Sequence, residues 1–399
     1  MSGVVIIGGG QSGLEAAAAL RKEQYPGAIT LVCEEPHAPY QRPALSKDYL
    51  LGKMDAARLE LRALTFYQAQ RIDLLLGERA ASIDCAAHRV QLTSSESLNY
   101  HKLILAVGAR NRPLNIPGAG SALYLRSLDE ARALKQRIAE AGSIAVIGGG
   151  FIGLEVAAAA RLQGKTVTVI EAQSRLMARA VPTLLSEFFR ELHVSKGVDV
   201  RLNTGVAAIE QGAVRLSNGA SVPADLAVAG IGVIPNIELA RESGLTIGNG
   251  IQVDEFLRTS HPDVYAIGDC ADHPNIFSGS RVRLESVQNA IDQAKCVARG
   301  IVDKAVAYSD VPWFWTDQYD VKFQMVGLSG GHDQEVLRGS KQAGKFSLFY
   351  FKACRLVAVD SVNRFADHIG ARKLLAANAP LTAEQAADET LDLRKLNQA

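Results

Sequence analysis

The stretch Val4-Val5-Ile6-Ile7-Gly8-Gly9-Gly10-Gln11-Ser12-Gly13 decides the fold of this chain. Its β-branched run suits a strand buried on both faces of a parallel sheet, and an Ala-rich helical stretch to about Lys22 follows the glycines. In this Gly-x-Gly-x-x-Gly pattern, Gly8 permits a tight turn, Gly10 leaves room for a pyrophosphate, and Gly13 lets helix and strand pack closely. We call residues 8–13 the first fingerprint.

A second fingerprint, Gly148-Gly149-Gly150-Phe151-Ile152-Gly153, follows the run Ile144–Ile147 and opens another predicted helix, to about Gln163. In both units the next apolar run ends in an acid, which a Rossmann unit uses to bind an adenosine ribose about 20 residues beyond its glycines. Two complete units predict two dinucleotides, a bound FAD and a visiting NADH. The predicted FAD contacts are Gly8, Gly10, Ser12, Gly13 and Glu34, and the predicted NADH contacts are Gly148, Gly150, Ile152, Gly153 and Glu171.

Glu171 also bears on the choice of nicotinamide. A carboxylate at the ribose accepts hydrogen bonds from a free 2′-hydroxyl and repels a 2′-phosphate, so NADH is favoured over NADPH. Arg175 and Arg179 follow closely and are included in the predicted NADH site. They would contact the pyrophosphate or the adenine, tolerate a 2′-phosphate, or be solvated surface charges.

Composition indicates a large soluble enzyme of two or three domains. The 399 residues include 43 basic and 42 acidic side chains, so no global charge favours nucleic acid. We find no apolar run of membrane-spanning length and no basic segment before the first strand, and we expect a cytoplasmic location. The five cysteines have neither redox-dithiol nor metal-site spacing, and we predict small buried side chains and no metal.

Two further segments point to the FAD site. The strand-like run Leu103–Leu105 ends in Ala106 and Gly108, and the run from Asp263 ends in Gly268-Asp269, whose carboxylate suits a hydroxyl chain. The predicted fold is therefore α/β, with two Rossmann-like domains and a C-terminal α+β domain. We expect an FAD domain over residues 1–107 and 248–307, an NAD domain over 108–247, and a C-terminal domain over 308–399. In the C-terminal domain we expect strands at 322–326, 335–338, 345–351 and 356–362, a helix at 364–377 and a partly ordered tail from 382.

Four segments carry a resemblance over nearly the whole chain: Glu34-Glu35-Pro36 through Pro39-Tyr40-Gln41-Arg42-Pro43-Ala44-Leu45-Ser46-Lys47, the second fingerprint through Glu155, Ala266–Ala271, and Pro312-Trp313-Phe314-Trp315-Thr316-Asp317-Gln318. Together they resemble the flavoprotein superfamily with two dinucleotide-binding domains. Within it, they are similar to the NADH-dependent ferredoxin reductases that supply cytochromes P450 and Rieske-type oxygenases. Ala44 departs from this group, which often has a second proline there.

The resemblance implies roles for single residues. Lys47 would lie beside the flavin N5 and pair with Glu155, where a cation stabilises negative charge that develops on the ring. Arg42 would contact the FAD phosphates or ring, and Trp315 would lie near the isoalloxazine. Glu285 and Val287 would approach its pyrimidine edge.

The implied reaction passes a hydride from NADH to FAD and then single electrons to a [2Fe–2S] ferredoxin that supplies a P450 or Rieske-type oxygenase. Rubredoxin is a close variant of this partner. The alternatives are an NADH oxidase, a peroxidase or a disulfide reductase, which use a cysteine near the flavin, or a non-enzymatic NADH-sensing flavoprotein. An acidic ferredoxin would need a basic surface, for which the candidates are Arg62, Arg71, Lys322, Arg338 and Lys341.

Overall fold

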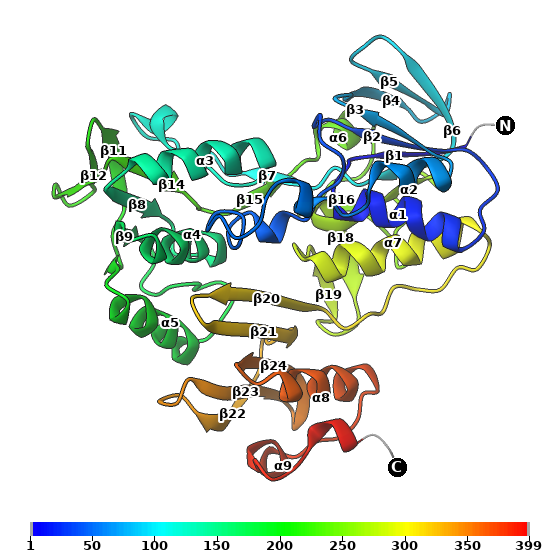
Figure 1. Ribbon diagram of the computed structural model, residues 1–399. Helices are drawn as coiled ribbons and strands as arrows, with labels where there is room; N and C mark the ends of the chain where they lie inside the picture. Colours follow the sequence, from blue (N-terminus) through cyan, green and yellow to red (C-terminus); the bar gives the residue numbers. More distant parts are fainter. Residues whose placement is uncertain (1–2, 397–399) are drawn as a thin grey trace.

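The computed structural model describes residues 3–396, and Figure 1 shows two α/β units side by side with a smaller domain below them. The first unit is built on a seven-stranded sheet of order β3-β2-β1-β6-β5-β4, with β17 also paired to β6. Helices α1 and α7 lie side by side against this sheet. Its elements are β1 (Gly3–Ile7), α1 (Gln11–Lys22), β2 (Ile29–Cys33), α2 (Leu64–Ala69), β3 (Ile72–Leu76), β4 (Ala80–Asp84), β5 (Arg89–Leu92), β6 (Ser97–Leu105), β17 (Val264–Ala266) and α7 (Val287–Ile301).

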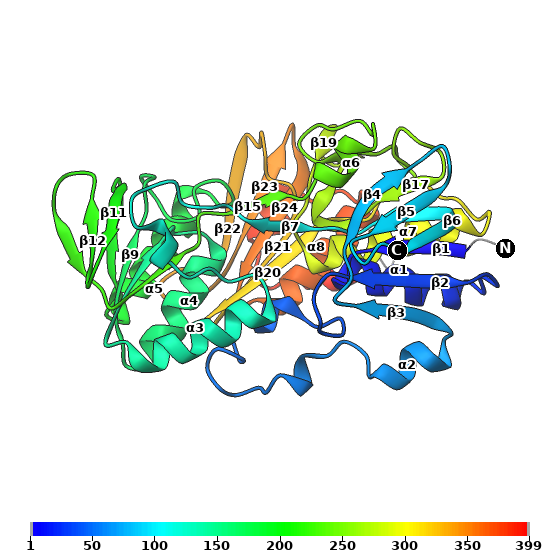
Figure 2. The same cartoon turned by 90° about the horizontal axis from the view of Figure 1, so that it is seen from above.

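The second unit repeats the strand–helix–strand pattern. Its four parallel strands have the order β10-β9-β8-β14, and a three-stranded antiparallel sheet, β11-β12-β13, extends from it. Figure 2 shows this extension at the end of the molecule farthest from the first unit. Its elements are α3 (Leu128–Glu140), β8 (Ser143–Ile147), α4 (Phe151–Leu162), β9 (Thr166–Ile170), α5 (Thr183–Ser195), β10 (Asp199–Arg201), β11 (Val206–Glu210), β12 (Ala213–Leu216), β13 (Ser221–Pro223) and β14 (Leu226–Ala229).

Two short antiparallel strands carry the chain between the units, β7 (Ala109–Asn111) outward and β15 (Val233–Pro235) back. After β15, helix α6 (Glu238–Glu242) already places Ala240 in the core of the first unit, together with Leu245. By packing, the chain therefore returns to the first unit before the predicted boundary at residue 248. A small sheet of β16 (Ile251–Gln252), β18 (Ala271–Asn275) and β19 (Ser280–Val282) completes that unit.

The C-terminal domain is a five-stranded antiparallel sheet of order β20-β21-β24-β23-β22 with helices on one side, so the predicted α+β class is confirmed. The first strand, β20, was not among the expected ones. The elements are β20 (Trp313–Gln318), β21 (Val321–Gly327), β22 (Gln334–Ser340), β23 (Lys345–Lys352), β24 (Arg355–Val362), α8 (Phe365–Ala376) and α9 (Ala383–Ala387). Residues 1–2 and 397–399 of the predicted domains lie outside the described residues.

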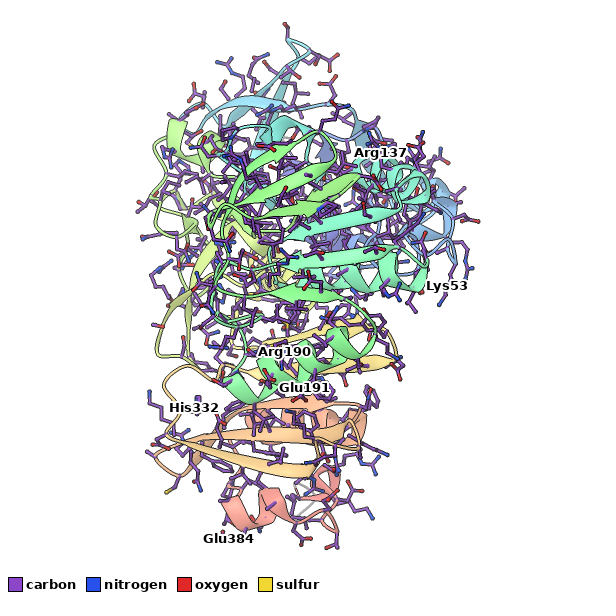
Figure 3. All side chains as sticks on the ribbon, turned by 90° about the vertical axis from the view of Figure 1, so that its left-hand side faces the viewer. Lys53, Arg137, Arg190, Glu191, His332 and Glu384 are labelled. Atoms are coloured by element: carbon purple, nitrogen blue, oxygen red, sulfur yellow. The ribbon has the colours of Figure 1, made fainter. Side chains whose placement is uncertain are left out.

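The tail that was predicted to be partly ordered is packed onto this domain up to residue 396. Ala386 and Leu393 are buried in its core, and the Arg338 guanidinium donates to the carbonyl oxygens of Asp388 and Leu391. Arg338 is only 2 % exposed, so its assignment to a basic docking surface is wrong. Lys341 pairs with Glu191 at 3.0 Å, on the end of α5 that Figure 3 shows above the C-terminal sheet.

None of the helices between residues 3 and 396 is long and apolar enough to cross a membrane.

Candidate flavin and nicotinamide sites

The first fingerprint has three glycines with three different surroundings. Gly8 has φ +117°, and a Cβ there would lie 2.2 Å from the Ala106 carbonyl oxygen. A Cβ on Gly13 would lie 1.9 Å from the Gly8 oxygen, so this glycine permits the close contact of α1 with the turn. A Cβ on Gly10 would meet no protein atom within 4 Å. Gly10 therefore borders open space, which leaves room for a pyrophosphate.

The second fingerprint repeats this arrangement. Gly148 has φ +107°, and a Cβ there would lie 2.5 Å from the Gly230 oxygen. A Cβ on Gly153 would lie 2.2 Å from the Gly148 oxygen, whereas one on Gly150 would have its nearest neighbour at 3.9 Å. Beside them, the Ile152 side chain is 44 % exposed, an apolar surface at the start of α4.

Both fingerprint helices begin without a side-chain cap. Gly10 and Gly150 are the N-cap residues of α1 and α4, and neither has a side-chain hydrogen bond to the first turn. The backbone N–H groups of each first turn therefore point at the open space beside the second glycine, together with the positive end of the helix dipole. These two cradles fit the phosphates of FAD and of NADH.

The acid of the second unit is held at its fingerprint. Glu171 accepts hydrogen bonds from the backbone N–H of Gly149 at 2.6 Å and of Gln173 at 2.7 Å. This carboxylate lies where a ribose acid is expected, at the end of β9.

The acid of the first unit is placed differently. Ile7 pairs with Val32 in the first sheet as Ile147 pairs with Ile170 in the second, so Cys33 is the positional counterpart of Glu171. Glu34 comes one residue later, is 69 % exposed at its side chain, and lies 3.6 Å from Arg79. Its neighbour Glu35 is the more enclosed acid.

Arg175 and Arg179 separate into two environments. The Arg175 guanidinium is tied into its own loop, where it donates to the carbonyl oxygens of Val181 and Ala178 and to the Ser186 hydroxyl. Arg179 has no hydrogen-bond or ion-pair partner among residues 3–396, and its Nη2 lies 3.2 Å from where a Cβ on Gly232 would stand. Of the two, Arg179 is the one available to a ligand.

Two ion pairs and one hydrogen bond to a backbone carbonyl link Glu35 to Asp269. The Arg42 guanidinium donates to Glu35 at 2.5 Å and to the Arg126 carbonyl oxygen at 2.7 Å. The Arg126 guanidinium in turn pairs with Asp269 at 2.7 Å. These contacts place Arg42 and Asp269 in one network, as expected for a shared site. Glu35 lies within the first segment that carries the resemblance, but no role was predicted for it, and no motif marks Arg126.

Two of the other segments predicted to contact FAD, at Ala106 and at Gly268, lie against the first fingerprint. Ala106 donates its N–H to the Ile7 oxygen at 2.8 Å, and Gly108 follows with φ +64°. A Cβ on Gly268, beside Asp269, would lie 2.8 Å from the buried Ser12 hydroxyl oxygen. Val287 is the first residue of α7, capped by Ser286, and Glu285 is an exposed acid paired with Arg283 at 2.7 Å.

Lys47 and Glu155 form the ion pair that the resemblance implies, with Lys47 Nζ 2.8 Å from the carboxylate. Glu155 is only 3 % exposed and also accepts from the hydroxyls of Ser46 and Thr316. Lys47 and Ser46 come from the first unit, Glu155 from α4 of the second, and Thr316 from β20. The pair therefore stands where all three domains meet. Ser46 and Thr316 lie within the two segments that carry the resemblance, but no role was predicted for them.

Strand β20 has two functional faces because side chains alternate along a strand. Phe314 and Thr316 face the second unit, and the Phe314 ring contacts Phe151 at a centroid distance of 4.8 Å. Trp313 and Trp315 face the other way and line a cavity of about 560 Å³ together with Asp317, Lys322, Gln324, Asn363, Arg364 and Phe365. We call this cavity the Trp315 groove. Trp313 also packs on α8, beside His368 and Arg372.

The cysteines near the first fingerprint are poor nucleophiles. Cys33 and Cys270 are buried, and burial raises the pKa of Cys33 to about 12 and that of Cys270 to about 11. Both thiols are therefore protonated at neutral pH. No group of three or more His, Cys, Asp or Glu side chains between residues 3 and 396 could hold a metal ion.

The two cradles and the charged pair at their junction define a flavoprotein reductase with two dinucleotide units. Residues 2–294 match the family described as pyridine nucleotide-disulphide oxidoreductase, and residues 313–397 match the reductase C-terminal domain. The chain belongs to the pyridine nucleotide-disulphide oxidoreductase family, and its cofactors are FAD and NADH.

Its relatives include reductases of ferredoxins. Rhodocoxin reductase of Rhodococcus erythropolis is 49 % identical over 98 % of this chain and 93 % of its own. The crystal structure of the ferredoxin reductase for the CYP199A2 system of Rhodopseudomonas palustris has a TM-score of 0.97 at 45 % identity and covers 99 % of each chain. The covalent putidaredoxin reductase–putidaredoxin complex has a TM-score of 0.96 at 38 % identity, covering 99 % of this chain and 97 % of that one. The predicted resemblance is confirmed.

Proposed function

We propose that this chain is an NADH:ferredoxin oxidoreductase that supplies electrons, through a [2Fe–2S] ferredoxin, to a cytochrome P450 or Rieske-type oxygenase. The Lys47–Glu155 pair carries the proposal, because it joins the two dinucleotide units where the flavin ring and the nicotinamide would meet. Relatives named as ferredoxin reductase components of dioxygenase systems, and the solved structure of the reductase for the CYP199A2 system, support the same partner class.

Bound FAD would supply the exchange between a two-electron donor and a one-electron acceptor. The chain's residues would then bind and orient. The first-turn N–H groups beyond Gly10 and Gly150 hold the phosphates, and Glu171 holds the nicotinamide's adenosine ribose. Lys47, fixed by Glu155, would present a cation to the flavin and so stabilise negative charge on the ring, with no proton transfer by a side chain.

A thiol route is disfavoured by the positions of the cysteines. The segment Pro39–Lys47 stands where disulfide reductases and peroxidases of this scaffold carry a cysteine, and it has none. The buried Cys33 and Cys270 are too weakly acidic to serve in its place. One-electron delivery to a protein therefore remains the best account, with rubredoxin as the variant partner.

We place the exit of electrons at the Trp315 groove. Trp315 lines it while the adjacent Thr316 contacts Glu155, so a single strand separates the groove from the charged pair. Lys322 supplies positive charge, and Phe365, 64 % exposed, supplies an apolar contact, whereas the Arg364 guanidinium is paired with Asp367 and Glu389. An acidic ferredoxin fits this combination.

The deciding experiment is NADH-driven cytochrome c reduction by the purified holoprotein, with and without a [2Fe–2S] ferredoxin from an oxygenase system. A large ferredoxin-dependent rate is expected. If NADH bleaches the flavin and neither ferredoxin nor rubredoxin adds anything, an oxidase, peroxidase or sensing role replaces this proposal, and oxygen and peroxide consumption identify which.

A cytoplasmic location is part of the proposal. All five cysteines are free, as expected in a reducing compartment. Fractionation of cells that express the protein tests it, and recovery outside the cytoplasmic fraction contradicts it.

A further inference from the structure

Behind Glu155 runs a line of buried polar side chains that the proposed reaction does not use. Thr316 and Gln318 lie on the inner face of β20, and His193 lies on α5; their exposed fractions are 0 %, 1 % and 0 %. Thr316 Oγ1 lies 2.5 Å from Glu155, Gln318 Nε2 lies 3.4 Å from Thr316 Oγ1, and His193 Nε2 lies 2.9 Å from Gln318 Oε1. The Tyr319 hydroxyl lies 3.4 Å from His193 Nδ1.

The donors of this line all point the same way. The Thr316 hydroxyl has one hydrogen and gives it to the carboxylate, so toward Gln318 it only accepts. The Gln318 amide nitrogen must then face Thr316, which leaves its oxygen to accept from His193 Nε2–H. His193 Nδ1 carries no hydrogen in that tautomer and accepts from Tyr319.

Burial keeps the outer members neutral, as this arrangement needs. It lowers the pKa of His193 to about 4 and raises the pKa of Tyr319 to about 12. Four successive donors therefore end on one carboxylate, and hydrogen bonds in such a line polarise one another.

We propose that Thr316, Gln318 and His193 are positioning residues that hold the Glu155 carboxylate toward Lys47, and through Lys47 set the reduction potential of the bound flavin. The inference rests on the proposed placement of Lys47 at the flavin. Without the line, Glu155 loses a donor and its fixed orientation, Lys47 moves from the ring, and negative charge on the reduced flavin is less stabilised. The potential then falls.

The test compares variants of the FAD-loaded full chain. Gln318→Met removes the amide at similar length, Thr316→Val removes the hydroxyl, and Thr316→Ser keeps it. Tyr350→Phe is the matched control, because it breaks a buried hydroxyl–carboxylate bond to Asp360 in the same sheet, outside the line. The readouts are the flavin midpoint potential, from reductive titration against a reference dye, and the unfolding temperature.

We expect Gln318→Met and Thr316→Val to lower the ratio of reduced to oxidised flavin about tenfold at a fixed solution potential. For a two-electron couple, this corresponds to a midpoint potential that is lower by about 30 mV. Thr316→Ser and Tyr350→Phe should keep the wild-type potential. A Gln318→Met protein that melts earlier, as Tyr350→Phe does, yet keeps or raises its potential overturns the inference.

Lys47→Met separates this inference from the proposed function. If Lys47→Met lowers the potential and Gln318→Met does not, only the positioning role fails. If neither changes it, the placement of Lys47 at the flavin fails as well. ¹⁵N NMR of the histidine rings gives a second test that needs no stable variant in β20. The wild-type signal that disappears in His193→Gln belongs to His193. This signal should show that the ring hydrogen is on Nε2, and a hydrogen on Nδ1 would contradict the proposed direction of the hydrogen bonds.

Discussion

The two dinucleotide units share a fingerprint but differ in how the surrounding chain closes over it. In the second unit, Glu171 folds back onto the fingerprint and accepts a hydrogen bond from the backbone N–H of Gly149. In the first, the counterpart position is the apolar Cys33, and a charged network from Glu35 to Asp269 ties several distant segments together. An enclosed site suits a cofactor that stays, and an open one suits a substrate that leaves after each turnover.

The matched variants Gly10→Val and Gly150→Val should have the largest effects, each on the binding of one cofactor. Both glycines have φ near −80° and free space for a side chain, so the fold is retained while phosphate is excluded. Gly10→Val should weaken FAD binding at least about 100-fold, equivalent to about 2.8 kcal/mol, and yield colourless protein. Gly150→Val should stay yellow and lose NADH affinity instead.

Flavin absorbance and NADH titration measure both effects, and circular dichroism checks the fold. Each variant is the control for the other. Loss of FAD from both, or from neither, would contradict the assignment of one cofactor to each unit.

Lys47→Met tests the junction of the units. Removal of the cation should slow flavin reduction by NADH about 100-fold with FAD still bound, as for the loss of one preorganised charge-stabilising group. Stopped-flow absorbance at saturating NADH measures it. Lys53→Met, an exposed lysine of the same segment (labelled in Figure 3), is the control and should react normally. A normal rate in Lys47→Met would return this residue to a structural role.

Glu171→Gln sharpens the comparison on the nicotinamide side. With the negative charge gone, repulsion of a 2′-phosphate weakens, and the preference for NADH over NADPH should narrow about tenfold. The ratio of kcat/KM values measures this preference. Glu34→Gln, in the first unit, should leave the ratio unchanged. If Glu171→Gln also leaves it unchanged, Glu171 does not contact the ribose.

Replacement of all five cysteines by Ala or Ser should have the smallest effect. Because burial raises the pKa of Cys33 to about 12, its thiol carries no charge at pH 8 and contributes only packing. NADH-driven ferredoxin reduction should stay within about twofold of wild type in any well-folded variant. Loss of that activity in a folded protein would revive a thiol mechanism.

Local patterns in the sequence predicted the parts of the fold that depend on neighbours in the chain. The fingerprint glycines, the strands before them and the helices after them follow from spacing alone, and the structure places them as expected. The Lys47–Glu155 pair came from the family resemblance, since nothing local joins two residues so far apart.

Local sequence patterns did not predict the contacts between domains. Arg126 and His193 belong to ordinary-looking segments, and Gln318 lies in a segment that carries the resemblance but had no predicted role; the packing of the domains brings each to its partner. The tail after residue 382 looked loose because it is polar, but Arg338 satisfies its carbonyl groups from inside the sheet. Composition does not report such a distant donor.

The alternation of side chains along β20 has a consequence for protein engineering. Trp315 and Asp317 line the proposed electron exit, so substitutions there should change the choice of redox partner, while Phe314, Thr316 and Gln318 hold the strand against the second unit. One six-residue strand thereby separates the choice of recipient from the chemistry of the donor. Substitutions intended to redirect this protein to another electron carrier therefore belong at Trp315 and Asp317.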